Sequence, residues 1–161
     1  MPPDARPGKD RYYIDIARAV AQRGTCQLRN YGAVIVSKDD HIVSTGYNGA
    51  PRGMANCIDS DRPCARKNAN HQQGERYDSC RSVHAEMNAV IHVSRGEMQG
   101  ATLYLVGVPG REAALDKDPE PCQLCKRLII NAGITTVIAE RIGGDLRTFA
   151  VTDWVAEDLG V

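Results

Sequence analysis

The sequence predicts an α/β fold in which helices cover both faces of a central sheet. Two observations lead to this prediction. Near the N-terminus, two apolar runs flank a short polar turn, which is typical of a β-hairpin. Further along the chain, short apolar runs alternate with segments of helical periodicity, as in units where strands lie side by side beneath helices.

The first part of the chain contains one helix and the hairpin. Apolar residues at helical spacing predict a helix over 10–23, which Gly24 ends. The run Tyr-Gly-Ala-Val-Ile-Val-Ser at 31–37 predicts a buried strand, and 41–47 predicts its partner beyond a Lys-Asp-Asp turn. Residues 1–9 are expected to form a flexible lead-in.

The remaining chain alternates between elements and polar loops. The loop at 48–80 is long for a compact domain, and such loops are usually functional or held by a metal. Helices are predicted over 84–95, 122–132 and 147–159, strands over 101–107 and 135–139, and a second polar loop over 108–120.

The composition is that of an ordinary globular protein. The chain has 161 residues, 42% hydrophobic and 25% charged, so we expect a single domain over 1–161. Lys+Arg and Asp+Glu each number 20, and this balance argues against nucleic acid as a partner. No apolar run approaches the ~20 residues that cross a bilayer, and the N-terminus lacks an apolar signal region. These features predict a cytoplasmic protein without membrane association, in which six cysteines indicate metal binding rather than disulfides.

Two short motifs combine into one strong signal. The run His-Ala-Glu at 84–86 is a weak motif alone, and Pro-Cys-Gln-Leu-Cys at 121–125 could be a redox pair or a zinc-ribbon edge. In this order they match H-x-E…P-C-x-x-C, the signature of zinc-dependent nucleobase deaminases. His84, Cys122 and Cys125 would supply three ligands of a tetrahedral zinc site that leaves one position open for water.

Helix geometry supports a shared site. Residues i and i+2 lie about 200° apart around a helix, so His84 and Glu86 converge only just beyond a helix N-terminus. The apolar run 85–93 predicts a helix that begins there, and Pro121 suits the start of the next one. The two cysteines lie at i and i+3 and share one face of that helix.

The expected chemistry follows from the ligand set. Zinc brings the pKa of bound water towards about 7, and Glu86 would carry the water's proton to N3 of a cytosine ring and help ammonia depart. The alternative is a closed Cys2His structural zinc site with a fourth ligand elsewhere, which leaves Glu86 without a role.

Over residues 11–140 the chain resembles the deoxycytidylate (dCMP) deaminase family of the cytidine deaminase superfamily. The matching segments are Thr25-Cys26, Gly32 to Val36, Gly46 to Gly53, His84 to Val90, Thr102 to Tyr104, Pro121-Cys122, Cys125-Lys126 and Leu128 to Ile134. The resemblance implies a three-layer α/β/α sandwich with a central mixed sheet. It also implies zinc ligands at His84, Cys122 and Cys125 and the proton shuttle at Glu86.

The resemblance assigns three substrate contacts. Asn48 matches the position that binds the sugar hydroxyl, the backbone of Ala85 would lie near the pyrimidine O2, and Arg95 matches a nucleotide- or interface-associated arginine. Two of these residues have alternative interpretations. Asn48 before Gly49 suits a tight turn, and Arg95 suits a solvated helix end.

A second, structural zinc is a further expectation. In some dCMP deaminases cysteines that match Cys26 and Cys57 bind such an ion, and Cys80 matches a cysteine of bacterial members. The predicted ligands are Cys26, Cys57 and Cys80, with Cys64 or His71 as the fourth. The alternative is a set of separate buried free thiols.

The predicted reaction is zinc-dependent conversion of dCMP to dUMP and ammonia. Alternatives are another substrate (CMP, cytidine, cytosine, a modified cytosine nucleotide or adenine in tRNA) and a non-catalytic zinc-stabilised nucleotide-sensing module. Some family members bind dCTP or dTTP as effectors and form hexamers, so a homo-oligomer (hexamer or dimer) with such effectors is expected. One departure is a longer loop at 107–120, in which Glu120 replaces the usual Ser and Arg111 and Lys117 could meet a phosphate.

Overall fold

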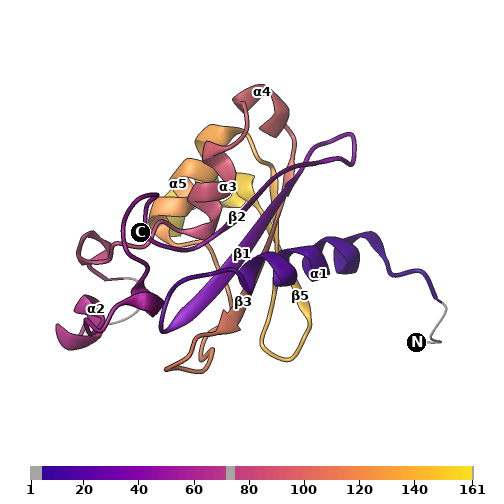
Figure 1. Ribbon diagram of the computed structural model, residues 1–161. Coiled ribbons are helices and arrows are strands. Elements are labelled where there is room, and N and C mark those ends of the chain that lie inside the picture. The colour runs from indigo at the N-terminus through magenta and orange to yellow at the C-terminus, as the bar shows by residue number, and fades with distance from the viewer. Residues whose placement is uncertain (1–4, 72–74, 161) are drawn as a thin grey trace.

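The computed structural model describes residues 5–71 and 75–160, whose strands form one mixed sheet (Figure 1). The sheet order is β2-β1-β3-β4-β5. The strands are β1 (Arg29–Val36), β2 (Ile42–Tyr47), β3 (Thr102–Pro109), β4 (Thr136–Glu140) and β5 (Leu146–Ala150). β3 and β4 run parallel, and the other neighbouring pairs run antiparallel. The predicted hairpin is β1–β2.

Helices cover both faces of this sheet, which confirms the predicted three layers. On one face lies α1 (Lys9–Ala21); on the other lie α3 (Ala85–Ile91), α5 (Gln123–Ala132) and α6 (Val151–Ala156). β3 shows the division, because Leu103 and Leu105 are buried with α3 and α5, whereas Tyr104 and Val106 are buried with α1. This alternation is the two-residue period of a strand that is buried on both faces.

Two glycines let helices rest directly on the sheet. A Cβ atom at Gly32 of β1 would lie 2.1 Å from the carbonyl oxygen of Ala17 in α1. A Cβ atom at Gly46 of β2 would lie 2.3 Å from the carbonyl oxygen of Ala85 in α3. Contacts this short involve helix backbone, so only glycine fits at either position. The start of α3 is therefore positioned by the backbone of β2.

Both ends of the chain differ in detail from the prediction. Residues 1–4 of the predicted lead-in lie outside the described residues, and Lys9 already belongs to α1. The predicted helix 147–159 begins later, because Leu146–Ala150 forms β5. Glycines at 143 and 144, both with positive φ, turn the chain back so that β5 pairs antiparallel with β4 at the edge of the sheet. The remaining residues form α6 and a 3-10 turn, η3 (Asp158–Gly160).

The predicted helix 84–95 is divided in two. α3 ends at Ile91, and α4 (Arg95–Met98) begins after Ser94, whose side-chain oxygen accepts a hydrogen bond from the backbone N–H of Glu97. This is N-terminal capping, which favours a new helix start at Ser94 over continuation of the first.

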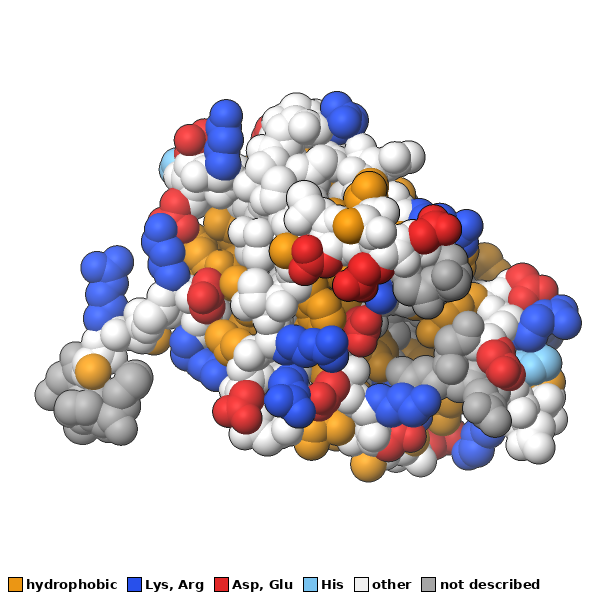
Figure 2. Space-filling view, turned by 180° about the vertical axis from the view of Figure 1, so that it is seen from behind, with side chains coloured by type: hydrophobic (Ala, Val, Ile, Leu, Met, Phe, Trp, Pro, Cys, Tyr) orange, Lys and Arg blue, Asp and Glu red, His pale blue; other side chains and the backbone are white. Residues whose placement is uncertain are grey.

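In its described residues, the long loop at 48–80 carries three short helical segments. They are η1 (Cys57–Asp59), α2 (Ala65–Asn68) and η2 (Tyr77–Ser79). On the face that Figure 2 shows, Lys and Arg side chains are interspersed with Asp and Glu, as the balanced composition leads one to expect. Within the described parts of the chain, no helix has the length and apolar character needed to cross a bilayer.

Candidate active site

Two helix starts meet at one cluster of potential metal ligands. His84 is the N-cap residue of α3 and Cys122 that of α5, while Cys125 lies in the first turn of α5 and is fully buried. His84 Nδ1 lies 3.5 Å from Cys122 Sγ and 3.4 Å from Cys125 Sγ. Over 5–71 and 75–160, this is the only group of three His, Cys, Asp or Glu residues with ligand atoms within 4.8 Å of one another.

The separations fit a zinc ion. Bonds of about 2.3 Å to sulfur and 2.0–2.1 Å to nitrogen, at tetrahedral angles, place those two atoms roughly 3.5 Å apart. The observed nitrogen–sulfur distances of 3.4 and 3.5 Å agree with this value. The donor set of one imidazole and two thiols is also one that zinc prefers.

The electrostatics of the two cysteines favour cation binding. Hydrogen bonds from Cys125 and from His84 stabilise the Cys122 thiolate and lower its pKa to about 4, although burial opposes the shift. The hydrogen bond to Cys122, together with burial, raises the pKa of Cys125. The two sulfurs therefore share one proton, which a metal cation would replace because it binds thiolates.

Glu86 lies beside this cluster but is not part of it. The residue is 5% exposed, in the first turn of α3. Burial is the main cause that raises the pKa of Glu86, and the nearby His84 charge opposes it. A buried carboxyl group whose pKa is raised suits proton transfer.

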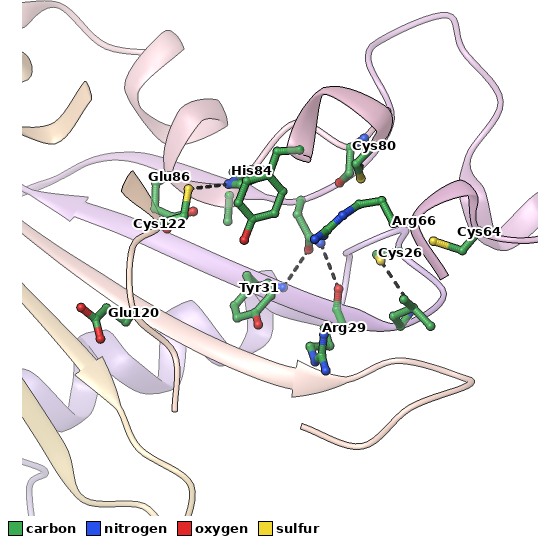
Figure 3. Close-up of a pocket in the computed structure, with 15 residues that line it drawn as sticks. Cys26, Arg29, Tyr31, Cys64, Arg66, Cys80, His84, Glu86, Glu120 and Cys122 are labelled. Carbon is green, nitrogen blue, oxygen red and sulfur yellow. Dashed lines mark hydrogen bonds between the residues drawn. The ribbon is translucent and has the colours of Figure 1, made fainter. Parts of the chain in front are cut away.

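A cavity of about 120 Å³ opens from Glu86 towards the long loop (Figure 3). Its lining residues come from β1, the start of α3 and the loops at 22–28, 48–84 and 110–122: Cys26, Leu28, Arg29, Tyr31, Asn48, Cys64, Arg66, Tyr77, Cys80, Ser82, His84, Ala85, Glu86, Glu120 and Cys122. The cavity thus includes Glu86, two of the three predicted ligands of the catalytic zinc (His84 and Cys122) and two of the three predicted substrate contacts.

Asn48 lines the cavity while anchoring the hairpin. Its Oδ1 accepts a hydrogen bond from the Tyr31 backbone N–H at 2.7 Å, and its Nδ2 donates to the Arg29 carbonyl at 3.0 Å. An amide has two donor hydrogens and two acceptor lone pairs, so one of each remains after these bonds. These bonds tie the end of β2 to β1, which is a structural role other than a tight turn, and they leave the predicted sugar contact as a prediction.

Arg95 does not line this cavity. It begins α4, and its Nε donates to the Asn131 carbonyl at 2.9 Å. Its contact with a nucleotide stays a prediction.

The other cysteines gather at the far end of the cavity from Glu86. Cys26, Cys64 and Cys80 line it. Cys57 lies near Cys26: burial raises the pKa of Cys57, and the Cys26 thiol adds to this shift. Among the described residues, however, these cysteines and His71 do not form a three-ligand group within 4.8 Å. The second zinc stays a prediction.

The loop at 107–120 contributes less to the cavity than predicted. β3 extends to Pro109, and Glu120 is the one residue of the loop among those that line the cavity. Arg111 donates instead to the Ile58 carbonyl at 3.3 Å. Lys117 does not line the cavity either.

Two tyrosines and two arginines of the cavity were not predicted from the sequence. Tyr31 precedes Gly32 in β1, and burial raises its pKa to about 12, with a contribution from nearby Glu86. Tyr77 stands edge-on to His84, with 4.7 Å between ring centroids. Tyr31 directly precedes a matched Gly-Ala-Val segment, a signal that could have identified it. No pattern in the polar loop marks Arg66 or Tyr77.

Comparisons with known proteins agree with this site. The family model described as the cytidine and deoxycytidylate deaminase zinc-binding region matches residues 7–141. The deoxycytidylate deaminase of Mycobacterium phage D29 is 39% identical over 139 residues, which cover 83% of this chain and 95% of that protein. That of Schizosaccharomyces pombe is 34% identical over 133 residues, and the match spans 37% of its length.

A solved structure has the same fold. The dCMP deaminase from the cyanophage S-TIM5, in complex with dCMP and dUMP, superposes with a TM-score of 0.56 at 24% identity and covers 83% of this chain and 81% of that one. The fold, the ligand cluster and the extent of the family match lead to one conclusion: this chain belongs to the cytidine and deoxycytidylate deaminase zinc-binding family.

Proposed function

We propose that the protein catalyses the hydrolytic deamination of dCMP to dUMP and ammonia. One observation carries this proposal: the buried carboxyl group of Glu86 adjoins a three-ligand zinc cluster without belonging to it. A closed structural site would need a fourth protein ligand, and the described residues supply no larger group there. This arrangement supports a hydrolase over a purely structural metal site.

The residues of the site have distinct roles in this reaction. His84, Cys122 and Cys125 would hold zinc, which supplies Lewis-acid activation of the attacking water. Glu86 takes a proton from the water and delivers it to N3 of the cytosine ring; it then takes the proton of the new C4 hydroxyl and delivers it to the departing amine. The C4–O bond forms, the C4–N bond breaks and ammonia leaves. Because burial favours its neutral form, Glu86 can hold the proton between these transfers.

The other cavity residues would orient the nucleotide. Asn48 has one amide hydrogen and one lone pair available for a sugar hydroxyl. The backbone of Ala85, at the start of α3, would lie against the pyrimidine O2. Arg66 gives the cavity wall a permanent cation, which suits a phosphorylated substrate. The names of the phage and yeast relatives also support dCMP.

An ammonia-release assay tests this function. The zinc-loaded protein is given dCMP, CMP, deoxycytidine, cytidine or cytosine, with and without dCTP and dTTP. The highest kcat/KM is expected for dCMP. A preference for CMP or an unphosphorylated compound would refute the substrate assignment, and the absence of turnover with every compound would favour a nucleotide-sensing module.

Several features of the family are extended to this chain as part of the same proposal. They are organisation as a single domain, cytoplasmic location, assembly into a homo-oligomer, control by deoxynucleoside triphosphates and a second zinc at the cluster of Cys26, Cys57, Cys64 and Cys80. Metal analysis tests the last of these, because one zinc per chain would exclude the structural ion.

A further inference from the structure

Arg66 connects the long polar loop to the catalytic cluster. It lies in α2, and its Cζ atom stacks over the Tyr77 ring at 4.6 Å from the centroid. Tyr77 in turn contacts His84 at 4.7 Å between ring centroids. Because Tyr77 stands between them, the distance from Arg66 Cζ to the centroid of the His84 ring is less than twice 4.7 Å. This upper limit is comparable to the span of a pyrimidine nucleotide from its ring C4 to its 5′-phosphate.

A hydrogen bond and a ring contact hold the Arg66 guanidinium in place. One nitrogen, Nη2, donates to the Glu75 carbonyl at 2.8 Å, while the guanidinium stacks on the phenol ring of Tyr77. In Figure 3, the Arg66 side chain extends from its helix into the cavity, towards Tyr31 and His84. An arginine held by stacking is preorganised, so binding an anion costs it less side-chain entropy.

The other arginine of the cavity is differently placed. Arg29 donates from Nη2 to Asp116 Oδ1 at 2.6 Å, which holds its guanidinium beside the loop at 110–118. Its guanidinium is turned away from Arg66 in Figure 3. The carboxylate of Glu120, at the opposite end of the cavity, is similarly engaged by Lys126 at 2.9 Å.

We propose that Arg66 binds the 5′-phosphate of the nucleotide substrate and that the Tyr77 ring holds its guanidinium in place. This inference rests on the proposed function and makes it more specific. The cytosine ring would lie at the His84 and Glu86 end of the cavity, with the phosphate at the Arg66 end. The planar guanidinium suits phosphate because it presents several N–H donors in one plane. The long loop would thereby select nucleotides over nucleosides.

Kinetics on two substrates test the proposal. The zinc-loaded wild-type protein and the variants Arg66→Gln, Arg66→Lys and Arg29→Gln are assayed with dCMP and deoxycytidine. We expect Arg66→Gln to reduce the ratio of kcat/KM for dCMP to that for deoxycytidine by about 10- to 100-fold, mainly through KM, because one charge-assisted contact is lost. Arg66→Lys should restore part of the ratio.

A matched control is Arg76→Gln. Arg76 belongs to the same loop, is exposed, and pairs with Asp78 at 3.0 Å outside the cavity, so its loss should leave the ratio unchanged. Equal losses for both substrates in Arg66→Gln would overturn the phosphate assignment. A changed ratio in Arg29→Gln but not in Arg66→Gln would overturn it as well.

Binding measurements separate this inference from the reaction itself. If the wild-type protein deaminates none of the compounds, the proposed function fails, but calorimetry with dUMP and deoxyuridine still tests Arg66. Weaker binding of dUMP alone in Arg66→Gln supports the phosphate contact. Unchanged binding of dUMP refutes it.

Discussion

The Tyr77 ring packs edge-on against the imidazole of His84, with 4.7 Å between the centroids and 80° between the planes. Tyr77 belongs to η2 in the long loop, and His84 is the N-cap residue of α3. The positive edge of one ring therefore meets the face of another, the geometry that aromatic pairs favour. Tyr77 thereby restrains the orientation of His84, a proposed zinc ligand.

This contact predicts different outcomes for two substitutions. Tyr77→Phe retains the ring and should bind zinc within about twofold of the wild-type affinity, whereas Tyr77→Leu should lose on the order of tenfold. Competition with a chromogenic zinc chelator measures both. Equal affinities in the two variants would show that the ring does not support His84.

Glu86→Gln is predicted to stop turnover without disturbing the fold. General acid–base groups contribute about 10²- to 10⁴-fold, so kcat should fall by at least that lower factor. Because burial already disfavours the charged carboxylate, the neutral amide should not lower the free energy of unfolding. Zinc analysis, denaturant unfolding and ammonia release check the three parts. Turnover within tenfold of wild type would exclude Glu86 as the proton carrier.

The two glycines under the helices form a natural pair for a packing test. Gly46→Ala should push α3 off β2, and Gly32→Ala should push α1 off β1, because each new methyl group meets helix backbone. Each should cost about 1–3 kcal/mol of unfolding free energy or more. Only Gly46→Ala should also reduce kcat per bound zinc, since α3 carries Glu86 and begins at His84.

Denaturant unfolding and kcat at a temperature where both variants remain folded distinguish these effects. Equal kcat values in the two glycine variants would mean that the catalytic geometry does not depend on how closely α3 approaches β2.

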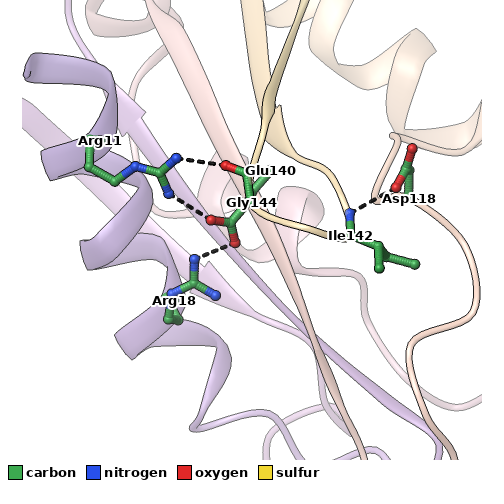
Figure 4. Close-up of polar contacts among 6 residues, drawn as sticks. All are labelled: Arg11, Arg18, Asp118, Glu140, Ile142 and Gly144. Carbon is green, nitrogen blue, oxygen red and sulfur yellow. Dashed lines mark hydrogen bonds and ion pairs between the residues drawn. The ribbon is translucent and has the colours of Figure 1, made fainter.

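Glu140 predicts a pH dependence of stability. At the end of β4 it pairs with Arg11 at 2.7 Å and with Arg18, both from α1 (Figure 4). Burial alone would raise the pKa of Glu140, but the hydrogen bonds from Arg18 and Arg11 outweigh it and lower this pKa below 4.5. A depressed carboxyl pKa stabilises the fold above the unfolded-state pKa, and this contribution is lost as the pH falls through the folded-state value.

Glu140→Gln should therefore destabilise the protein by about 2 kcal/mol at pH 7. The difference from wild type should shrink as the pH falls below 4.5, where the wild-type carboxylate becomes protonated. Urea unfolding at several pH values measures it. Asp15→Asn, at an exposed position of the same helix, is the control and should show little change at any pH. A difference that grows on acidification would contradict the assigned ion pairs.

Much of the fold and the centre of the site could be predicted from the sequence, because their signals are local. Continuous apolar runs indicated β1, β3 and β4, since these strands are buried along most of their length. β2 is exposed at half of its positions and was indicated by its place after the polar turn of a hairpin. β5 gave no such signal, because most of its residues are exposed. Its hydrogen bonds to β4 are what make it a strand. Its residues were therefore assigned to a helix.

By itself the sequence indicated the centre of this protein: a set of residues that can hold zinc, a carboxyl group proposed to move protons, and their position at helix starts. These properties follow from residue type and from short spacings, which helix geometry converts directly into position. Only the tertiary structure decided that Tyr77 supports His84, that Arg66 reaches the cavity and that α3 rests on Gly46. Such contacts depend on the path of an irregular loop and on how closely a helix approaches the sheet, and neither has a periodicity that the chain can display.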